Sequence, residues 1–284
     1  MKLIVTTDGS ERSLRVLPAA RQFAEAAGAG ITLLRVLDPR TDLAQEVAPT
    51  VQEAAERVEA RWKEEMSALL REHGIDGEVA IPSRGRAEDI YRVILRAADE
   101  RESDMVAMTT RGAGLLRHAI LGSVGMSVLA NARVPVMFTS GEADLPPVTD
   151  GYHIVITTDG SPASESIFDL LAPVLVPGKM RVTVLYVSGA QLGEDADWEM
   201  EPRLEALCER LPGGVASSVA IRQVPVLGGV DTAIVNFARE TEANAIASST
   251  HGHSARRHLV AGSVAMGVLK QSPVSVIMAR SRKR

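Results

Sequence analysis

Two stretches of the chain carry the same residues, of types that can hold a phosphate group. Residues 110–112 and 121–124 read Thr-Arg-Gly and Leu-Gly-Ser-Val, and residues 250–252 and 261–264 read Thr-His-Gly and Ala-Gly-Ser-Val. A glycine lets the backbone approach a phosphate, while free N–H groups and the positive dipole of a helix start stabilise the anion. A serine N-cap after a glycine turn is the alternative that needs no ligand. The recurrence of the Gly-Ser pair beside other repeated motifs favours the ligand.

A second repeated motif places a carboxylate directly after an apolar run. Residues 4–10 (Ile-Val-Thr-Thr-Asp-Gly-Ser) recur as residues 155–161 (Val-Ile-Thr-Thr-Asp-Gly-Ser). The two aspartates, Asp8 and Asp159, can accept hydrogen bonds from a ribose hydroxyl or an adenine amino group. Asp-Gly is also a common turn, and serine a common helix cap. We therefore expect the two closing serines to be structural: Ser10 and Ser161.

The repeats divide the chain into two halves, each of which alternates short apolar runs with helical patterns. Such runs are typical of parallel strands covered on both faces. In the first half the predicted strands are 2–7, 31–37, 105–108 and 134–138; in the second they are 153–158, 180–187, 217–224, 244–249 and 274–279. The clearest helical stripe, with apolar residues three or four apart, comprises Val51, Ala54, Val58, Trp62, Met66 and Leu69.

Strand-helix alternation with short connections predicts an α/β fold: two tandem Rossmann-like domains, each a five-stranded parallel sheet with helices on both faces. We place the domains at residues 1–140 and 152–284, joined by a polar linker over 141–151. Ligands of such sheets bind beyond the carboxyl ends of the strands, where the strand order reverses. The repeated aspartates follow the first strand of each half and the first repeated glycines follow the fourth. Both motifs should therefore meet at one edge of each sheet.

This arrangement resembles the universal stress protein family, whose ATP-binding members carry Gly-x2-Gly-x9-Gly followed by Ser or Thr after the fourth strand. The resemblance covers essentially the whole chain. The residues that match the motif are Gly112, Gly122, Ser123, Gly252, Gly262 and Ser263. Thr109 and Ser249 replace the first glycine of the motif. A β-carbon there would narrow the groove or exclude a positive-φ conformation.

The resemblance implies an adenine-nucleotide α-hydrolase-like fold that binds ATP, with Mg²⁺ as the accompanying ion. It also implies that Asp8 and Asp159 approach the adenosine and that the backbone at Val36 and Val187 contacts the adenine ring. No catalytic residue and no protein metal ligand is assigned. The full set of expected nucleotide-binding residues is Thr7, Asp8, Val36, Met108, Thr109, Gly112, Gly122, Ser123, Val124, Thr158, Asp159, Val187, Ser248, Ser249, Gly252, Gly262, Ser263 and Val264.

Two further features of the sequence bear on assembly and on the site. The final strands of the halves, 134–139 and 274–279, resemble those through which family members pair, so the halves can pair within one chain. A homodimer of whole chains is a further option. Gly228-Gly229 can line the phosphate side of the second site or form the turn before a helix, and the sequence leaves both interpretations open.

Other patterns weigh against several classes of protein. The P-loop and the Gly-x-Gly-x-x-Gly dinucleotide fingerprint are absent, and residues 252–255 lack the closing glycine of a nucleophile elbow. The nearby His251, His253 and His258 suit a solvated loop better than a metal site, because no cysteine or carboxylate joins them. The net charge of −5 argues against binding to nucleic acid or anionic membranes.

The single cysteine, Cys208, excludes an intramolecular disulfide. The chain shows no signal-type segment and no run of about 18 apolar residues. We therefore expect a cytoplasmic protein.

Three functions are compatible with the sequence. The leading hypothesis is an ATP-binding regulator of the stress response, with at most slow ATP hydrolysis and an unidentified protein partner. The second is a nucleotide-free scaffold of the same fold that acts by dimerising. The third is an adenylating enzyme of the wider adenine-nucleotide α-hydrolase group. Such enzymes have a Ser-Gly-Gly loop after the first strand, whereas residues 7–10 read Thr-Asp-Gly-Ser.

Overall fold

The computed structural model describes residues 1–110, 121–140, 145–188, 194–224, 229–250 and 261–280. In these ranges ten strands form one continuous sheet with the order β3-β2-β1-β4-β5-β10-β9-β6-β7-β8. The strands of the first half are β1 (Lys2–Thr7), β2 (Gly30–Arg35), β3 (Gly77–Ala80), β4 (Met105–Thr109) and β5 (Val136–Thr139). Those of the second half are β6 (Tyr152–Thr158), β7 (Met180–Ser188), β8 (Ala216–Gln223), β9 (Ala245–Ser249) and β10 (Ser275–Ala279).

Pairing within each half is parallel, and the strand order reverses between β1 and β4 and again between β6 and β9. The predicted five parallel strands of each half are therefore confirmed, and the two sets join in one sheet. The strand ranges read from the apolar runs agree with the structure to within about two residues. The runs missed β3, because this edge strand is only four residues long and exposes Gly77 and Glu78.

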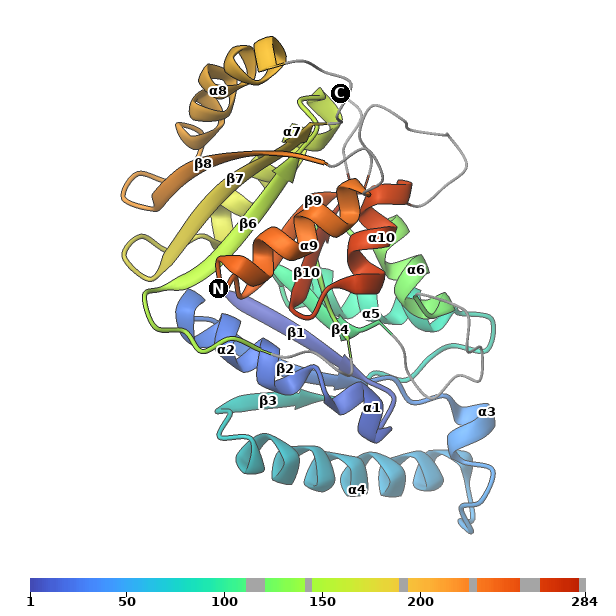
Figure 1. Ribbon diagram of the computed structural model, residues 1–284. Coiled ribbons are helices and arrows are strands. Elements are labelled where there is room, and N and C mark those ends of the chain that lie inside the picture. The colour runs from blue at the N-terminus through green and yellow to red at the C-terminus, as the bar shows by residue number, and fades with distance from the viewer. Residues whose placement is uncertain (111–120, 141–144, 189–193, 225–228, 251–260, 281–284) are drawn as a thin grey trace.

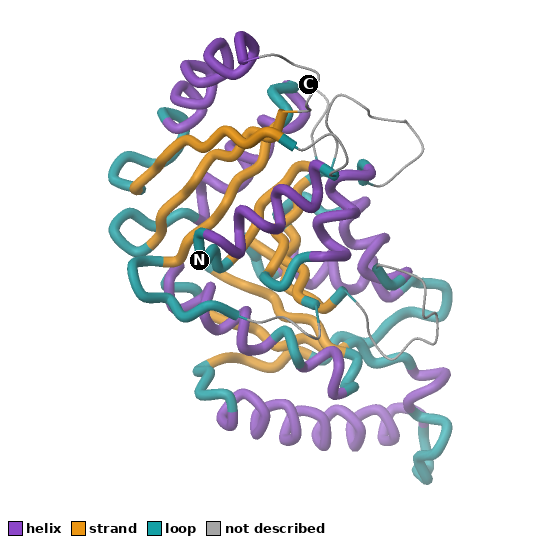
Figure 2. The backbone as a smooth tube through the Cα atoms, in the orientation of Figure 1, coloured by secondary structure: helices purple, strands orange, loops and turns teal. Residues whose placement is uncertain are grey.

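Helices cover both faces of the sheet (Figures 1 and 2). The helices of the first half are α1 (Glu11–Leu14), α2 (Leu17–Ala27), α3 (Pro39–Asp42), α4 (Val51–Glu72), α5 (Ile90–Glu100) and α6 (Ser123–Asn131). The second half has α7 (Pro162–Leu171), the 3₁₀ turn η1 (Ala172–Val174), α8 (Glu194–Cys208), α9 (Val230–Glu240) and α10 (Ser263–Gln271). One core lies under α2, α4, α7 and α8, and the other under α5, α6, α9 and α10.

The predicted stripe on α4 is correct at its centre and wrong at both ends. Ala54, Val58, Trp62 and Met66 are buried as expected. The stripe then continues at Leu70, and Leu69 is only half-buried, because a strict four-residue spacing from Ala54 leads to Leu70. Val51, in the first turn of the helix, is 73% exposed.

The two halves join through their last strands, as the sequence predicted. β5 and β10 pair antiparallel, with Met137 opposite Ile277. Both strands are fully buried along their length. The segment between the halves is also attached, since the Pro146 carbonyl accepts hydrogen bonds from Gln22 Nε2 at 3.2 Å and Asn244 Nδ2 at 3.0 Å. The chain is thus an internal pair of similar units.

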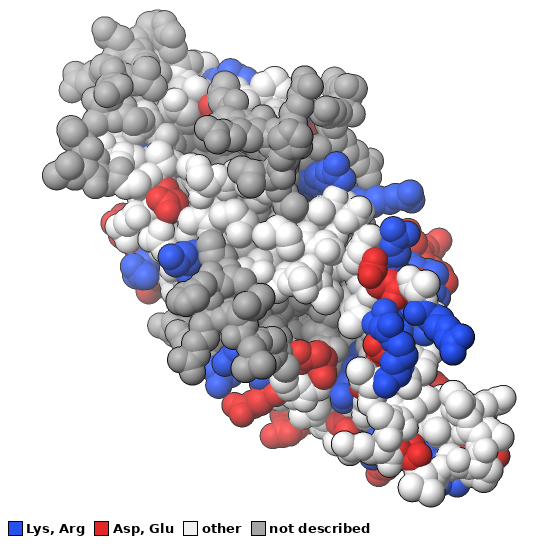
Figure 3. Space-filling view, turned by 90° about the vertical axis from the view of Figure 1, so that its right-hand side faces the viewer, with Lys and Arg blue, Asp and Glu red and all other residues white. Residues whose placement is uncertain are grey.

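The surface mixes charges of both signs. Figure 3 shows Lys and Arg side chains interspersed with Asp and Glu on the face turned to the viewer, beside a broad uncharged area. Among the described residues, no helix combines the length and the apolar character needed to cross a bilayer.

Candidate functional site

A pocket of about 110 Å³ opens at the carboxyl ends of β6, β7 and β9, where the strand order of the second half reverses. This is the place where open parallel sheets bind their ligands. The start of α10 and one side of α9 complete its walls. The residues that line the pocket are Thr157, Thr158, Asp159, Ser164, Leu185, Val187, Val230, Ile234, Ser248, Ser249, Thr250, Gly262, Ser263, Val264 and Ala265.

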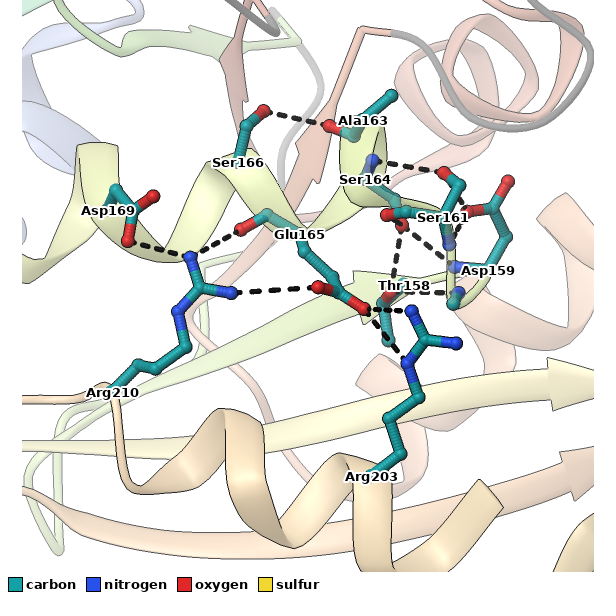
Figure 4. Close-up of polar contacts among 11 residues, drawn as sticks. Thr158, Asp159, Ser161, Ala163, Ser164, Glu165, Ser166, Asp169, Arg203 and Arg210 are labelled. Carbon is teal, nitrogen blue, oxygen red and sulfur yellow. Dashed lines mark hydrogen bonds and ion pairs between the residues drawn. The ribbon is translucent and has the colours of Figure 1, made fainter. Parts of the chain in front are cut away.

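A hydrogen-bonded loop after β6 fixes Asp159 at this edge (Figure 4). Its Oδ1 atom accepts from the Ser161 backbone N–H at 3.0 Å and from the Ser161 hydroxyl at 2.6 Å. The Thr158 hydroxyl accepts from Gly160 N–H at 3.0 Å and lies 2.8 Å from the Ser164 hydroxyl. The Ser161 hydroxyl in turn accepts from Ser164 N–H at 3.1 Å as the N-cap of α7.

The loop after β1 repeats this network. Asp8 Oδ1 accepts from the Ser10 N–H at 3.0 Å and from the Ser10 hydroxyl at 2.6 Å, and Thr7 Oγ1 lies 2.7 Å from Ser13 Oγ. Ser10 caps α1 through Ser13 N–H. The prediction that Ser10 and Ser161 are structural caps is therefore confirmed. Thr7 and Thr158, expected to bind the nucleotide, use their hydroxyls to hold these loops together.

Ion pairs join α7 to α8 and to the turn after it, next to the Asp159 loop (Figure 4). Arg203 donates to Glu165 Oε1 at 2.6 Å, and Arg210 donates to Asp169 Oδ1 at 2.7 Å. The Arg203 side chain is 48% exposed, so solvent screens the attraction and the pair contributes little to stability. Glu165 lies in the first turn of α7, directly after the Asp159 loop.

The helices α6 and α10 begin with glycines, and the serines after them are not the caps. Gly122 and Gly262 are the N-cap residues, without a capping side-chain hydrogen bond, and Ser123 and Ser263 occupy the first helical position. The alternative interpretation, a serine N-cap after a glycine turn, is thus wrong. Among the described residues, the N–H groups at the start of each helix donate no hydrogen bond to a capping side chain, so they remain available to an anion.

The space beside these glycines is open. Among the described residues, a Cβ added at Gly122 would meet no atom within 4 Å, and one at Gly262 would meet only the Thr250 carbonyl oxygen at 3.7 Å. Their φ angles of −63° and −68° are available to any residue. The backbone conformation therefore does not require glycine, and the space left by the described residues is compatible with close approach of a ligand.

The residues that replace the first motif glycine are buried at the ends of their strands. Thr109 and Ser249 end β4 and β9 in extended conformation, and they are 8% and 5% exposed. Alternation along β9 turns Ser248 toward the α9 and α10 face and Ser249 toward the opposite face. The Ser249 hydroxyl is enclosed there and has no hydrogen-bond partner within the described part of the chain.

The structure brings the predicted residues of the second half together. Those that line the pocket are Thr158, Asp159, Val187, Ser248, Ser249, Gly262, Ser263 and Val264. Their first-half counterparts end β1 and β4, follow β2, and open α6: Thr7, Asp8, Val36, Met108, Thr109, Gly122, Ser123 and Val124. The remaining two, Gly112 and Gly252, lie outside the described residues.

Sequence reasoning missed the apolar wall of the pocket. Leu185 precedes Val187 by two residues and so shares its strand face, while Val230 and Ile234 lie one turn apart on α9. These spacings are visible in the sequence, but they are equally typical of ordinary core positions. Gly229 is the N-cap of α9, which supports the turn interpretation for that glycine; Gly228 is outside the described residues.

The first half differs beside its aspartate. The Arg35 guanidinium lies 3.4 Å from the centre of the Trp62 ring, and a Cβ on Gly9 would stand 2.5 Å from its Nη1 atom. Burial lowers the pKa of Arg35, and the carboxylates of Asp42, Glu65 and Asp8 oppose that shift. The strand register puts Tyr186 at the corresponding place in the second half.

The described residues contain no group of three or more His, Cys, Asp or Glu side chains that could hold a metal ion. The histidines of 251–258 lie outside these residues. The geometry defines an α/β protein with two similar parallel-sheet halves, each with an aspartate loop and a glycine-capped helix at one sheet edge. The model of the universal stress protein family matches residues 1–140 and 152–280. The chain belongs to that family.

Individual relatives agree with this assignment. The "universal stress protein in QAH/OAS sulfhydrylase 3′region" of Thermus aquaticus is 30% identical over 135 residues, which cover 48% of this chain and 95% of that protein. A universal stress protein of Mycobacterium tuberculosis is 26% identical over 191 residues, 63% of this chain and 62% of that protein. The crystal structure of a universal stress protein from Archaeoglobus fulgidus has the same fold over 99% of this chain and 96% of its own, with a TM-score of 0.66 at 22% identity.

Proposed function

We propose that the chain is an ATP-binding regulator of the stress response, with its domains at 1–140 and 152–284 and its linker at 141–151, and that it acts in the cytoplasm. The observation that carries the proposal is the convergence of eight sequence-predicted residues on the pocket at the switch point of the second half. The first half repeats the aspartate loop and the glycine-capped helix, so it is a second candidate site.

The two ends of the pocket differ in a way that suits a nucleotide. Leu185, Val187, Val230 and Ile234 give one end an apolar wall, where a flat base can be buried. The start of α10 gives the other end uncapped N–H groups and a positive dipole for phosphate. The carboxylate of Asp159, held by its loop, can accept a hydrogen bond from the adenosine.

The chemistry of the lining also suits a nucleotide that carries Mg²⁺. This ion usually keeps several waters and is bound by substrate phosphates with one or two protein oxygen ligands, so it needs no dedicated protein cage. The oxygen groups of the lining suited to it are the Asp159 carboxylate and the Ser263 hydroxyl. When bound, the ion would neutralise phosphate charge beside the start of α10.

The proposal is tested by counting nucleotides. The purified chain is denatured, and the released nucleotide is identified and quantified; the stripped chain is then titrated with ATP and Mg²⁺. Two nucleotides per chain support a working site in each half, and one supports a division between a binding half and a structural half. No release and no titration signal would overturn the proposal in favour of the nucleotide-free scaffold.

A further inference from the structure

Two hydroxyl groups stand side by side on the floor of the second-half pocket. Thr157 on β6 and Ser248 on β9 are direct partners in the parallel register, and both line the pocket. Because side chains alternate along a strand, they share the sheet face of Val155 and Ile246, which α9 and α10 cover. The pair is therefore presented to the pocket from two adjacent strands.

The hydroxyl oxygens of this pair can accept hydrogen bonds from a ligand in the pocket. The Thr157 hydroxyl donates to the Ala247 carbonyl at 3.3 Å, and the Ser248 hydroxyl donates to the Ser249 carbonyl at 3.1 Å. Each hydroxyl has one hydrogen to give and two lone pairs. With the hydrogens directed to backbone carbonyls, the oxygens are available as acceptors, and they favour a ligand that donates two neighbouring hydrogen bonds.

The position of the pair points to the sugar of a nucleotide. The apolar wall comes from β7 and α9, and the start of α10 also lines the pocket. β6 and β9 lie between β7 and β10 in the sheet. A nucleotide with its base on the apolar wall and its phosphate at α10 lays its sugar over these two strands, and a ribose carries two adjacent hydroxyl donors.

We propose that Thr157 and Ser248 select ribonucleotides over deoxyribonucleotides by accepting hydrogen bonds from the ribose hydroxyls; this inference rests on the proposed nucleotide-binding function. The first half lacks the pair. The corresponding places on β1 and β4 are Thr6 and Met108, and a thioether is a weak acceptor. The two halves therefore differ in sugar selectivity.

The test isolates the second site in the full-length chain. Gly122→Val should block the first half, at a place where a Cβ meets no atom of the described residues within 4 Å. This variant is titrated calorimetrically with ATP, 2′-deoxy-ATP and 3′-deoxy-ATP. A hydrogen bond contributes about 1 kcal/mol, so ATP should bind about fivefold more tightly than at least one analogue. Adding Ser248→Ala or Thr157→Val should lower ATP affinity and abolish that preference, whereas Ser248→Thr keeps the hydroxyl and should retain it.

Thr6→Val, in the blocked first half, is the matched control and should leave the preference unchanged. Equal affinity for ATP and both analogues in the Gly122→Val chain would overturn the inference while leaving nucleotide binding intact. A preference that survives both Ser248→Ala and Thr157→Val would overturn it as well. If neither the wild-type chain nor the variant binds any of the three nucleotides, the proposed function itself fails and the inference with it.

Discussion

The hydroxyls of Thr139 and Ser275 lie 3.1 Å apart across the junction of the two halves. Thr139 is 1% exposed and Ser275 is fully buried, so neither group can turn to water. The contact joins the end of β5 to the start of β10. It helps to fix the antiparallel register through which the strands of both halves form one sheet.

This pair should behave as a coupled unit. Thr139→Val keeps the shape of the side chain but leaves the Ser275 hydroxyl buried without a partner, which should cost about 1–3 kcal/mol of unfolding free energy. Ser275→Ala removes the other partner and should also destabilise. The double variant should recover part of the loss, because no unpaired polar group remains. Urea unfolding of the wild type, the two single variants and the double variant measures the unfolding free energies. Strictly additive losses would show that the contact contributes no coupling free energy.

Stability should depend on pH through His153, which is 1% exposed. Its Nε2 atom lies 2.9 Å from Thr183 Oγ1 and its Nδ1 atom 3.2 Å from the Thr241 carbonyl oxygen. Burial, assisted by the charge of Arg181, lowers the pKa of His153 from 6.5 to about 4. The unfolded chain therefore binds the proton more readily than the folded chain, and this stabilising contribution is full above pH 6.5 and is lost as the pH falls toward 4.

The loss attributable to His153 should amount to about 2–3 kcal/mol of unfolding free energy. Denaturant unfolding at several values between pH 7 and pH 4 measures it in the wild-type chain and in His153→Gln, which cannot take up the proton. Carboxylates contribute to acid destabilisation in both chains, so the difference isolates the histidine. Identical pH slopes for the two chains would contradict the assignment.

The two aspartate loops should respond differently to the same substitution. Gly9 and Gly160 both have positive φ, +84° and +75°, so a side chain strains either backbone. At Gly9 a Cβ would also stand 2.5 Å from the Arg35 guanidinium, which is stacked on Trp62, whereas at Gly160 the nearest atom is the flexible tip of Met200 at 3.0 Å. Gly9→Ala should therefore destabilise the chain more than Gly160→Ala, by about 1 kcal/mol or more.

Thermal unfolding of the two variants and the wild type makes this comparison. Gly9→Ala is also made in an Arg35→Ala chain and compared with Arg35→Ala alone, because the clash is then absent and the difference between these two chains reports the backbone strain. A larger loss at Gly160 than at Gly9 would show that Arg35 moves aside at little cost.

Most of the fold and half of the candidate site could be predicted from the sequence, because both rest on local patterns. Repeated motifs predicted the Asp8 and Asp159 loops and the helices that follow Gly122 and Gly262. Continuous apolar runs predicted the long strands. The sequence did not predict β3, because this edge strand with exposed Gly77 and Glu78 lacks a continuous apolar run. The apolar wall at Leu185 and Ile234 was not predicted for a different reason. Pockets and cores contain the same types of apolar residue, and only the tertiary arrangement distinguishes the two.

The central claim is that nucleotide binding depends on close approach to the glycines that open α6 and α10, and calorimetric titration of the full-length chain with ATP and Mg²⁺ tests it most directly. The chains to compare are the wild type, Gly122→Val, Gly262→Val and the double variant, with circular dichroism to verify that each is folded. We expect Gly262→Val to abolish binding to the second half and the double variant to bind no ATP, since a branched side chain would occupy the open space beside the helix start. Unchanged ATP affinity and stoichiometry in a folded double variant would contradict the account.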